Sequence, residues 1–451
     1  MARAGAGESR AGATARPNVE ETVAEATAAT AARWRTFAVG STFRRRFEPE
    51  PAMNRLPPTA LARVLAPLDE RAFFDDHWER GPVHVERAET DRFADLVSTR
   101  AIETLLSTRE LRFPDVQLAR SGAEGGPIAI DAYTDPSRRI LPLRLIGHHR
   151  DGATIVLSHA HRELAPLGDL VRALGVELGW RCQTNLYLSP PGERGFASHY
   201  DTHDVFVLQV EGRKTFRFFG GGVELPFCDE TYDPESTGER VLESEIELGA
   251  GDTLYIPRGV VHDAVAHPDT ASLHVTLGLF PIVLRDVLIE SVRIAAERDV
   301  ELRRAPSPWR EPDGGLGAPR ESLRAALADA LDEELLSEAL ASLRDDVAIG
   351  AAPDVRGLID GAPSADELEL DTVLEVRRAA LPRLERRGSA PTLRTPGEVL
   401  GLGEANGEAV ERLLETGRAR VGELALPDDE RRLALARRLI EHGIVEIAPS
   451  G

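Results

Sequence analysis

Cysteine is almost absent from this 451-residue chain, and long apolar runs are missing altogether. The two cysteines, Cys182 and Cys228, form no C-x-x-C pair, so the sequence predicts neither a disulfide framework nor a thiolate zinc site. No uninterrupted apolar run reaches ~18 residues, and the N-terminus lacks the apolar core of a signal peptide. These absences indicate a soluble, cytoplasmic protein.

Lysine is nearly absent as well, and acidic residues outnumber basic ones. The chain holds 54 Lys and Arg against 75 Asp and Glu, which gives a formal net charge of −21. Such a charge argues against broad nucleic-acid binding. It would suit a basic protein partner, but acidity also favours solubility, which is the simpler explanation. The single lysine, Lys214, stands in a background that uses arginine at ordinary surface positions. Its retention indicates a site that needs a compact ammonium rather than a forked guanidinium.

A candidate metal site lies in the stretch from Asn185 to Thr215. His199 and Asp201 are two residues apart, and an extended strand places such residues on one face. His262, in a second strand-like run, supplies a third ligand if the two runs are neighbours in a barrel. Two histidines and one carboxylate with open positions form the facial triad that suits non-haem Fe(II) oxygen chemistry.

Other histidines offer alternatives to this ligand set. His267 and His274 are spare candidates for the third ligand, and His203 could pair with Asp201 in place of His199. Four further histidines are predicted to face solvent rather than to form a second metal site: His148, His149, His159 and His161.

The motif HYDTHDVFVLQVEGRKTFRF at 199–218, with NLYLSPPG before it and IPRGVVHDAVAHPDTASLHVTLGL after it, resembles the cupin-type JmjC family of ribosomal oxygenases. These are Fe(II)- and 2-oxoglutarate-dependent protein hydroxylases, and the resemblance covers roughly Leu56 to Pro281. It implies that iron is bound by His199, Asp201 and His262. It also implies a pocket for the cosubstrate 2-oxoglutarate, in which Lys214 grips the distal carboxylate and the lining includes Asn185, Tyr187 and Thr276.

The pattern of the core predicts a mixed, mainly β catalytic domain over 53–281, folded as a double-stranded β-helix, the cupin or JmjC jelly roll. Helices and a strand open this domain, and short runs separated by turns follow. The predicted strands of the core cover 182–189, 198–201, 204–210, 215–219, 251–257 and 272–280. The Ala- and Arg-rich residues 1–52 before it are predicted to be a disordered tail.

After Pro281 the sequence turns helical. Leucines at four-residue spacing predict helices over 282–299 and 320–346, and a capping box from Ser364 to Glu367 predicts a third over 365–384. Residues 282–388 are therefore predicted to form a helical domain, which the resemblance implies is used for homodimerisation. A short strand, two helices and a final strand over 389–451 resemble a small winged-helix domain. Its last helix carries arginines, but acidic neighbours favour a structural role over nucleic-acid binding.

These patterns lead to one main functional hypothesis, an Fe(II)- and 2-oxoglutarate-dependent oxygenase. The resemblance implies hydroxylation of a protein side chain, with Arg or His of a ribosomal protein as the target. A peptide or small-molecule natural-product intermediate fits the same site, as does N-demethylation of lysine. A zinc or manganese cupin, or a non-catalytic cupin-like regulatory protein, is the remaining alternative, and the position of Lys214 favours 2-oxoglutarate over both.

Overall fold

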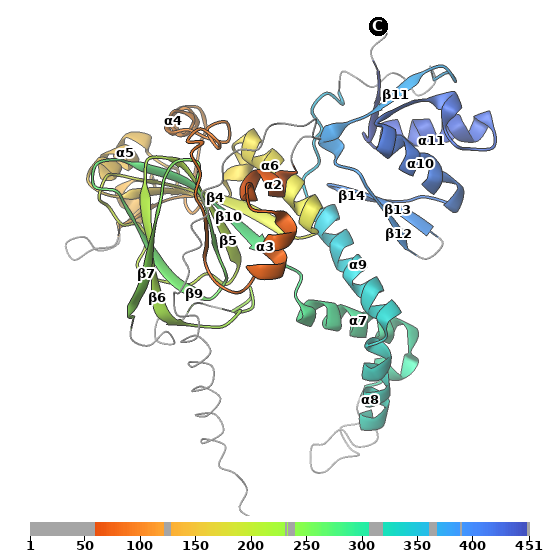
Figure 1. Cartoon of the computed structure of the whole chain (residues 1–451), viewed down its shortest axis with the longest axis horizontal. Coiled ribbons are helices and arrows are strands. Elements are labelled where there is room, and N and C mark those ends of the chain that lie inside the picture. The colour runs from red at the N-terminus through yellow and green to blue at the C-terminus, as the bar shows by residue number, and fades with distance from the viewer. Residues whose placement is uncertain are drawn as a thin grey trace, which may run out of the picture.

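The computed structural model describes residues 59–120, 128–230, 232, 240–305, 319–359, 368–387 and 390–448 (Figure 1). The predicted tail over 1–52 and the capping box at 364–367 lie outside these residues. Among the described residues, no helix combines the length and the apolarity needed to cross a bilayer.

The described chain opens with short helices that cover one side of the barrel. They are α2 (Ala60–Leu65), α3 (Glu70–Asp76) and α4 (Thr99–Thr108), with strand β1 (Val83–Val85) before α4. Thr59 and Asp69 begin α2 and α3 because their side chains accept hydrogen bonds from backbone amides of the first turn. Phe73 of α3 is fully buried, and its ring packs edge-on against Tyr255 with centroids 5.0 Å apart. This contact joins the helical cover to the barrel.

Two antiparallel sheets form the barrel. The larger has the order β1-β8-β5-β10-β4-β3-β2 and the smaller the order β7-β6-β9. Their strands, with β1 given above, are β2 (Val116–Ala119), β3 (Thr154–Leu157), β4 (Arg181–Ser189), β5 (Asp204–Glu211), β6 (Lys214–Gly222), β7 (Leu242–Leu248), β8 (Thr253–Ile256), β9 (Val260–Ala266) and β10 (Ser272–Phe280). Apolar side chains from both sheets meet in one cluster, which includes Val207, Phe216 and Leu254. The predicted JmjC/cupin jelly roll is thus confirmed.

Three details of the barrel differ from the prediction. Residues 198–201 were predicted as a strand but form only an isolated bridge, in which His199 pairs with His262. β7 was not predicted, because its sequence LESEIEL is largely exposed and acidic. The run around His262 is two strands, β8 and β9, separated by a turn with Gly259 at a φ of 86°.

Helices close the outer side of the larger sheet. α5 (Pro142–Arg150) and α6 (Ala165–Leu178) are joined by β3 and by the short 3₁₀ helix η2 (Ala160–Arg162), while η1 (Ile130–Ala132) precedes α5. The main hydrophobic core lies between these helices and the sheet, and it includes Leu145, Leu167, Leu174 and Leu186.

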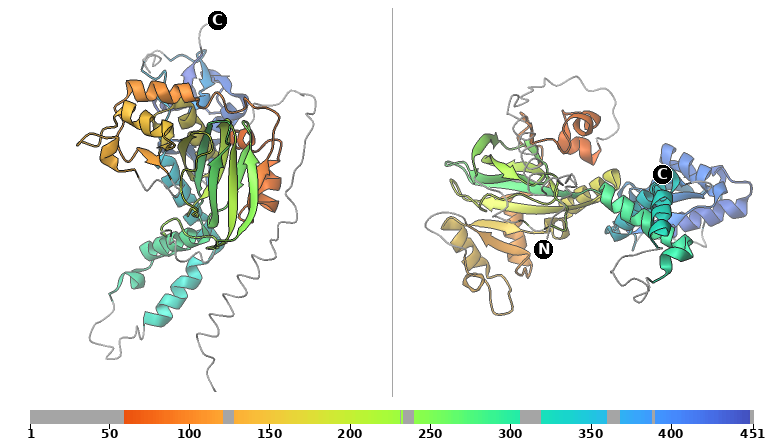
Figure 2. Two further views of the ribbon diagram at one scale, coloured as in Figure 1. Left: turned by 90° about the vertical axis from the view of Figure 1, so that its left-hand side faces the viewer. Right: turned by 90° about the horizontal axis from the view of Figure 1, so that it is seen from below.

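Three helices follow the barrel and extend away from it, as Figures 1 and 2 show. They are α7 (Leu284–Arg298), α8 (Pro319–Ala330) and α9 (Glu333–Gly350), with the 3₁₀ helix η4 (Val300–Arg303) after α7. The predicted helix over 320–346 is two helices, because Asp332 adopts an extended backbone and its side chain accepts a hydrogen bond from the Glu334 amide at 2.9 Å. Asp332 therefore begins α9 as its cap.

The predicted helix over 365–384 is wrong for its described part. This region contains β11 (Val373–Val376), η6 (Arg378–Ala380) and the start of β12 (Arg383–Arg387). β11 pairs with strands on both of its sides, β15 (Arg418–Arg420) and β16 (Val445–Ile447). Pairing with distant strands has thus overridden the local helix signal of this region.

The C-terminal region combines two small sheets with two helices. Besides β15-β11-β16 it has the sheet β12-β13-β14, so the predicted domain boundary at 388 falls between two paired strands. The remaining elements are β13 (Ala390–Thr395), β14 (Glu398–Gly401), α10 (Glu404–Thr416), η7 (Val421–Glu423) and α11 (Asp429–Glu441). The predicted helices and the final strand are therefore present, and they enclose a second core that includes Leu374, Leu413 and Leu439.

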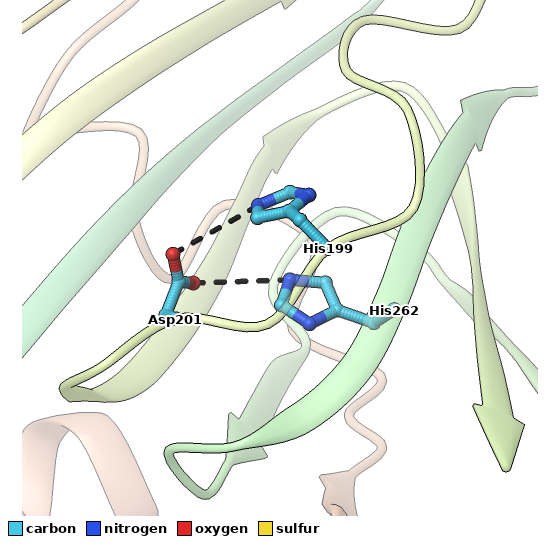
Figure 3. A group of neighbouring side chains, drawn as sticks. All are labelled: His199, Asp201 and His262. Carbon is cyan, nitrogen blue, oxygen red and sulfur yellow. Dashed lines mark ion pairs between the residues drawn. The ribbon is translucent and has the colours of Figure 1, made fainter. Parts of the chain in front are cut away.

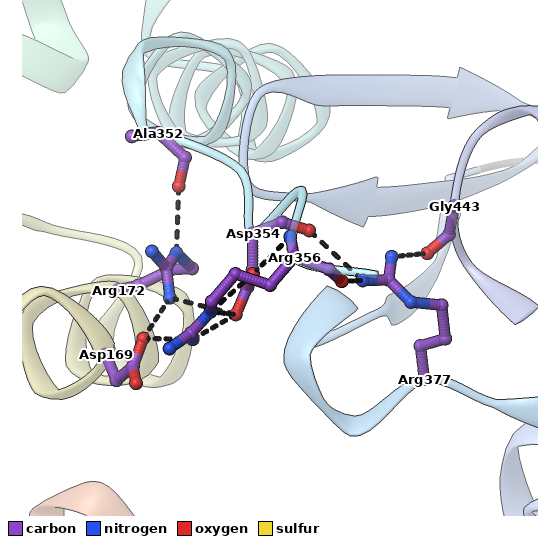
Figure 4. Close-up of polar contacts among 7 residues, drawn as sticks. All are labelled: Asp169, Arg172, Ala352, Asp354, Arg356, Arg377 and Gly443. Atoms are coloured by element: carbon purple, nitrogen blue, oxygen red, sulfur yellow. Dashed lines mark hydrogen bonds and ion pairs between the residues drawn. The ribbon is translucent and has the colours of Figure 1, made fainter. Parts of the chain in front are cut away.

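A polar network attaches the C-terminal region to α6 (Figure 4). It comprises Asp169, Arg172, Ala352, Asp354, Arg356, Arg377 and Gly443. Arg356 donates to the carboxylates of Asp169 and Asp354, while Arg172 Nε donates to the Ala352 carbonyl at 2.8 Å. Because α6 leads directly into β4, this network links the C-terminal region to a central strand of the barrel.

Candidate active site

Three potential metal ligands converge at the mouth of the barrel (Figure 3). His199 and Asp201 lie on the loop between β4 and β5, and His262 lies in β9. His199 and His262 exchange backbone hydrogen bonds of 3.0 and 2.7 Å, which brings their ring centroids to 4.9 Å. The Asp201 carboxylate is 3.8 Å from His199 Nε2 and 3.9 Å from His262 Nε2.

The two imidazoles present the same nitrogen to this point. Nδ1 of His199 lies 2.9 Å from the Ala197 carbonyl, and Nδ1 of His262 lies 3.0 Å from the Val260 carbonyl. A carbonyl only accepts, so each Nδ1 carries the proton and each Nε2 keeps its lone pair for a metal. The donor set and its orientation therefore fit a divalent metal ion.

Charge and burial at the triad agree with this assignment. Burial lowers the pKa of His262, which favours the neutral imidazole that a metal requires. Burial by itself raises the pKa of Asp201, but His262, His203 and His199, each of which is positive when protonated, outweigh burial and lower the pKa. Asp201 is thus held as a carboxylate.

The other candidate ligands are not part of this group, since within the described chain only His199, Asp201 and His262 form a cluster with metal-ligand geometry. His203 stacks on Phe280 with ring centroids 4.8 Å apart. Nδ1 of His267 accepts a hydrogen bond from the Asp269 amide.

The four histidines predicted to face solvent are all partly buried, so that prediction was wrong. His149 Nδ1 lies 2.8 Å from the Ala153 carbonyl. His161 Nδ1 accepts a hydrogen bond from the Thr184 amide, and burial lowers the pKa of His161 to about 4. These side chains contribute to local structure and do not form a second metal cluster in the described residues.

Lys214 begins β6 and lies inside the barrel. Only 2% of the residue is exposed, and burial lowers its pKa to about 7. Its Nζ donates to Ser189 Oγ at 2.9 Å, and this hydroxyl lies 2.9 Å from Thr154 Oγ1. Among the described residues Lys214 has no carboxylate within salt-bridge distance. A buried amine without a counter-charge is suited to bind an anion.

β4 and β10 supply the wall between Lys214 and the triad. Tyr187 and His274 face each other across these paired strands, and their rings stack with centroids 4.9 Å apart. Asn185 and Thr276 are also paired across these strands, two residues from Tyr187 and His274, so they lie on the same face. Asn185 Oδ1 accepts a hydrogen bond from the His159 amide at 3.1 Å. Burial and the negative charge of Asp201 both raise the pKa of Tyr187.

Three residues of this pocket were not assigned to it from the sequence. Ser189 continues the alternation of Asn185 and Tyr187, so strand periodicity could have identified it. His274 was considered only as a metal ligand, but its buried Nδ1 has no hydrogen-bond partner in the described part of the chain, and its ring is near Lys214. Thr154 has no sequence signal, because only the pairing of β3 with β4 brings it to Ser189.

Comparisons with known proteins agree with this architecture. Residues 169–287 match the model of the JmjC domain. Ribosomal oxygenase 1 of Danio rerio is 26% identical over 366 residues, which are 72% of this chain and 64% of that protein. Ribosomal oxygenase 1 of Gallus gallus is 32% identical over 249 residues, or 53% of this chain and 40% of that protein. The chain therefore spans about two thirds or less of the length of these relatives.

A third relative and a solved structure extend the comparison. The bifunctional lysine-specific demethylase and histidyl-hydroxylase NO66 of Drosophila melanogaster is 31% identical over 256 residues, 54% of this chain and 38% of that protein. The structure of Escherichia coli ribosomal oxygenase YcfD matches with a TM-score of 0.50 and 19% identity, covering 84% of this chain and 98% of that one. The resemblance to the JmjC family of ribosomal oxygenases is thereby confirmed.

Proposed function

We propose that this chain is an Fe(II)- and 2-oxoglutarate-dependent oxygenase that hydroxylates a protein side chain. One observation carries the proposal: a two-histidine, one-carboxylate triad shares a barrel with a buried lysine that has no ion-pair partner among the described residues. His199, Asp201 and His262 would hold the iron on one side and leave its other positions open. When bound, Fe(II) with 2-oxoglutarate and dioxygen supplies oxidation of a substrate C–H bond, with release of succinate and CO2.

The residues near Lys214 suit the charge of 2-oxoglutarate. Lys214 would bind the distal carboxylate through a charge-assisted hydrogen bond, and Ser189 already holds its Nζ at 2.9 Å. The stacked rings of Tyr187 and His274 would form the wall along the carbon chain and exclude water. Asn185 and Thr276 lie further along this wall.

A protein substrate follows from the relatives and from the charge of this chain. The relatives are named as ribosomal oxygenases, and one name includes histidyl-hydroxylase. A net charge of −21 favours encounter with basic proteins, and ribosomal proteins are basic. We therefore propose an Arg or His side chain of a ribosomal protein as the target, in the cytoplasm. Lysine N-demethylation, also in the name of that relative, is the second candidate.

The arginines of α11 support a structural role for the C-terminal region rather than nucleic-acid binding. Arg431 and Arg432 form ion pairs with Asp428 and Asp429, and Arg438 donates to the Gly401 carbonyl. These contacts engage arginine side chains that would otherwise bind the phosphate backbone of a nucleic acid.

The first experiment follows succinate formation from 2-oxoglutarate, with Fe(II)-loaded protein prepared without oxygen and then exposed to it. We expect slow turnover without substrate, loss of turnover in His199→Ala, and a raised 2-oxoglutarate requirement in Lys214→Ala. His148→Ala is the matched control, because this histidine is outside the triad. Turnover that survives His199→Ala, or no turnover by the wild type, would contradict the proposal.

A homodimer through the helical region is part of the proposal. Large apolar side chains of α7 and α8 are exposed, with Leu284 at 88% and Ile289 at 61%, and Leu327 and Leu331 add to this apolar surface. Exposed apolar surface of this kind is typical of a protein interface. Light scattering should report a dimer for the wild type and a monomer for Leu284→Glu with Ile289→Glu, whereas a monomeric wild type would refute it.

A further inference from the structure

The two segments that carry the triad run side by side in opposite directions. At one end His199 and His262 exchange backbone hydrogen bonds, and further along the Gly259 amide donates to the Asp201 carbonyl at 2.8 Å. Pairing between β5 and β8 begins at Val205, opposite Ile256. The stretch between these two sets of backbone bonds is bridged by side chains.

Arg258 and Asp204 form that bridge. Arg258 Nη1 donates to Asp204 Oδ2 at 2.6 Å, and Tyr255 Oη donates to Asp204 Oδ1 at 2.7 Å. The other end of the Arg258 guanidinium lies 2.7 Å from Glu79 Oε1, on the segment that follows α3. Asp204 is fully buried and Arg258 is 7% exposed.

The backbone at Glu79 is adapted to this contact. Its φ of 58° lies in the left-handed region, which residues other than glycine rarely adopt. The Glu79 amide donates to Tyr255 Oη at 3.0 Å, so Glu79 contacts the cluster through both backbone and side chain. The helical cover, the loop before β5 and the turn after β8 are therefore held at one point.

Stability alone is a weak reason for such a cluster, because apolar replacements of buried ion pairs are often neutral or stabilising. Its position suggests another reason, since Asp204 is three residues from Asp201 and Arg258 is four residues from His262. We propose that Arg258 is a positioning residue for the metal site. Through Asp204 and Glu79 it sets the separation between the segment with His199 and Asp201 and the segment with His262. This inference rests on the proposed function.

The test measures the affinity of the full chain for Mn(II), used as a stable substitute for Fe(II), by electron paramagnetic resonance. Arg258→Met should weaken Mn(II) binding by about 10-fold or more, the range seen when residues that orient metal ligands are replaced. Arg258→Lys should restore part of the affinity, because it keeps the charge but lacks the fork that reaches both carboxylates. Asp204→Asn keeps the shape of the cluster, so it serves if Arg258→Met does not fold.

Arg87→Met is the matched control. Arg87 is a largely buried arginine of the same domain, and it donates to the Gly251 carbonyl at 2.9 Å near the other end of β8. We expect this variant to lower the melting temperature and leave Mn(II) affinity unchanged. The inference would be overturned if folded Arg258→Met or Asp204→Asn bound Mn(II) as tightly as the wild type, or if Arg87→Met weakened Mn(II) binding equally. Either result would leave the proposed function standing. A wild type that binds no Mn(II) would overturn the proposed function with it.

Discussion

Lys214 leads to a prediction about protons as well as affinity. In the free protein burial lowers the pKa of Lys214 to about 7, so at pH 8 roughly nine tenths of the molecules carry a neutral amine. A carboxylate placed beside the amine favours its charged form and raises this pKa again. Binding of 2-oxoglutarate at pH 8 should therefore take up about 0.9 proton per site.

Replacement of Lys214 by methionine removes both effects. The lost interaction is a charge-assisted hydrogen bond, which contributes about 1.5–3 kcal/mol. The dissociation constant for 2-oxoglutarate should accordingly rise roughly 10- to 150-fold. Lys214→Arg is the informative comparison, because a guanidinium stays protonated at pH 8 and binding should then take up no proton.

Isothermal titration of 2-oxoglutarate into Mn(II)-loaded protein checks this prediction. Titrations in two buffers with different ionisation enthalpies give the number of protons taken up. Proton uptake that persists in Lys214→Met would place the titrating group elsewhere. Equal affinity of Lys214→Met and the wild type would refute the role of this amine as the carboxylate anchor.

Three further predictions concern the stability of the protein and the attachment of its C-terminal region to α6. Without ligand, Lys214 carries a proton in the unfolded chain but not in the folded protein between about pH 7 and 10.5. The free energy of unfolding should therefore rise with pH in this window by about 1.4 kcal/mol per pH unit. Urea unfolding of Lys214→Met at several pH values should show a smaller increase of this free energy with pH. Phe73→Ala should destabilise the barrel by about 3–5 kcal/mol, because the ring is fully buried; an unchanged urea midpoint would contradict the packing described here. Asp354→Asn removes the charge that Arg356 pairs with beside α6, so limited proteolysis should cut near residue 354 faster than in the wild type, and an unchanged rate would count against this attachment.

Much of the barrel was predictable because its signals are local. Strands buried on both faces read as short apolar runs between turns, and β5 and β10 were identified in this way. The ligands His199 and Asp201 are two residues apart, so their proximity needed no knowledge of the fold. The chain's single lysine likewise stood out from composition alone, before its burial was known.

Two of the differences come from pairing between residues far apart in the chain. β11 lies in a run that a capping box predicted to be helical, yet hydrogen bonds to β15 and β16 make it a strand. Thr154 joins the pocket only because β3 lies beside β4.

The sequence by itself indicated the groups that we propose carry the chemistry, namely His199, Asp201, one further histidine and a single lysine ammonium. Only the tertiary structure decided that His262, rather than His267 or His274, completes the triad, since β9 pairs with the loop at His199. It also buried Lys214 beside Ser189, which lowers the lysine pKa, and placed Arg258 against Asp204. The chemical identity of a side chain is local, whereas its distance from others and its exposure to water depend on the packing of the whole chain.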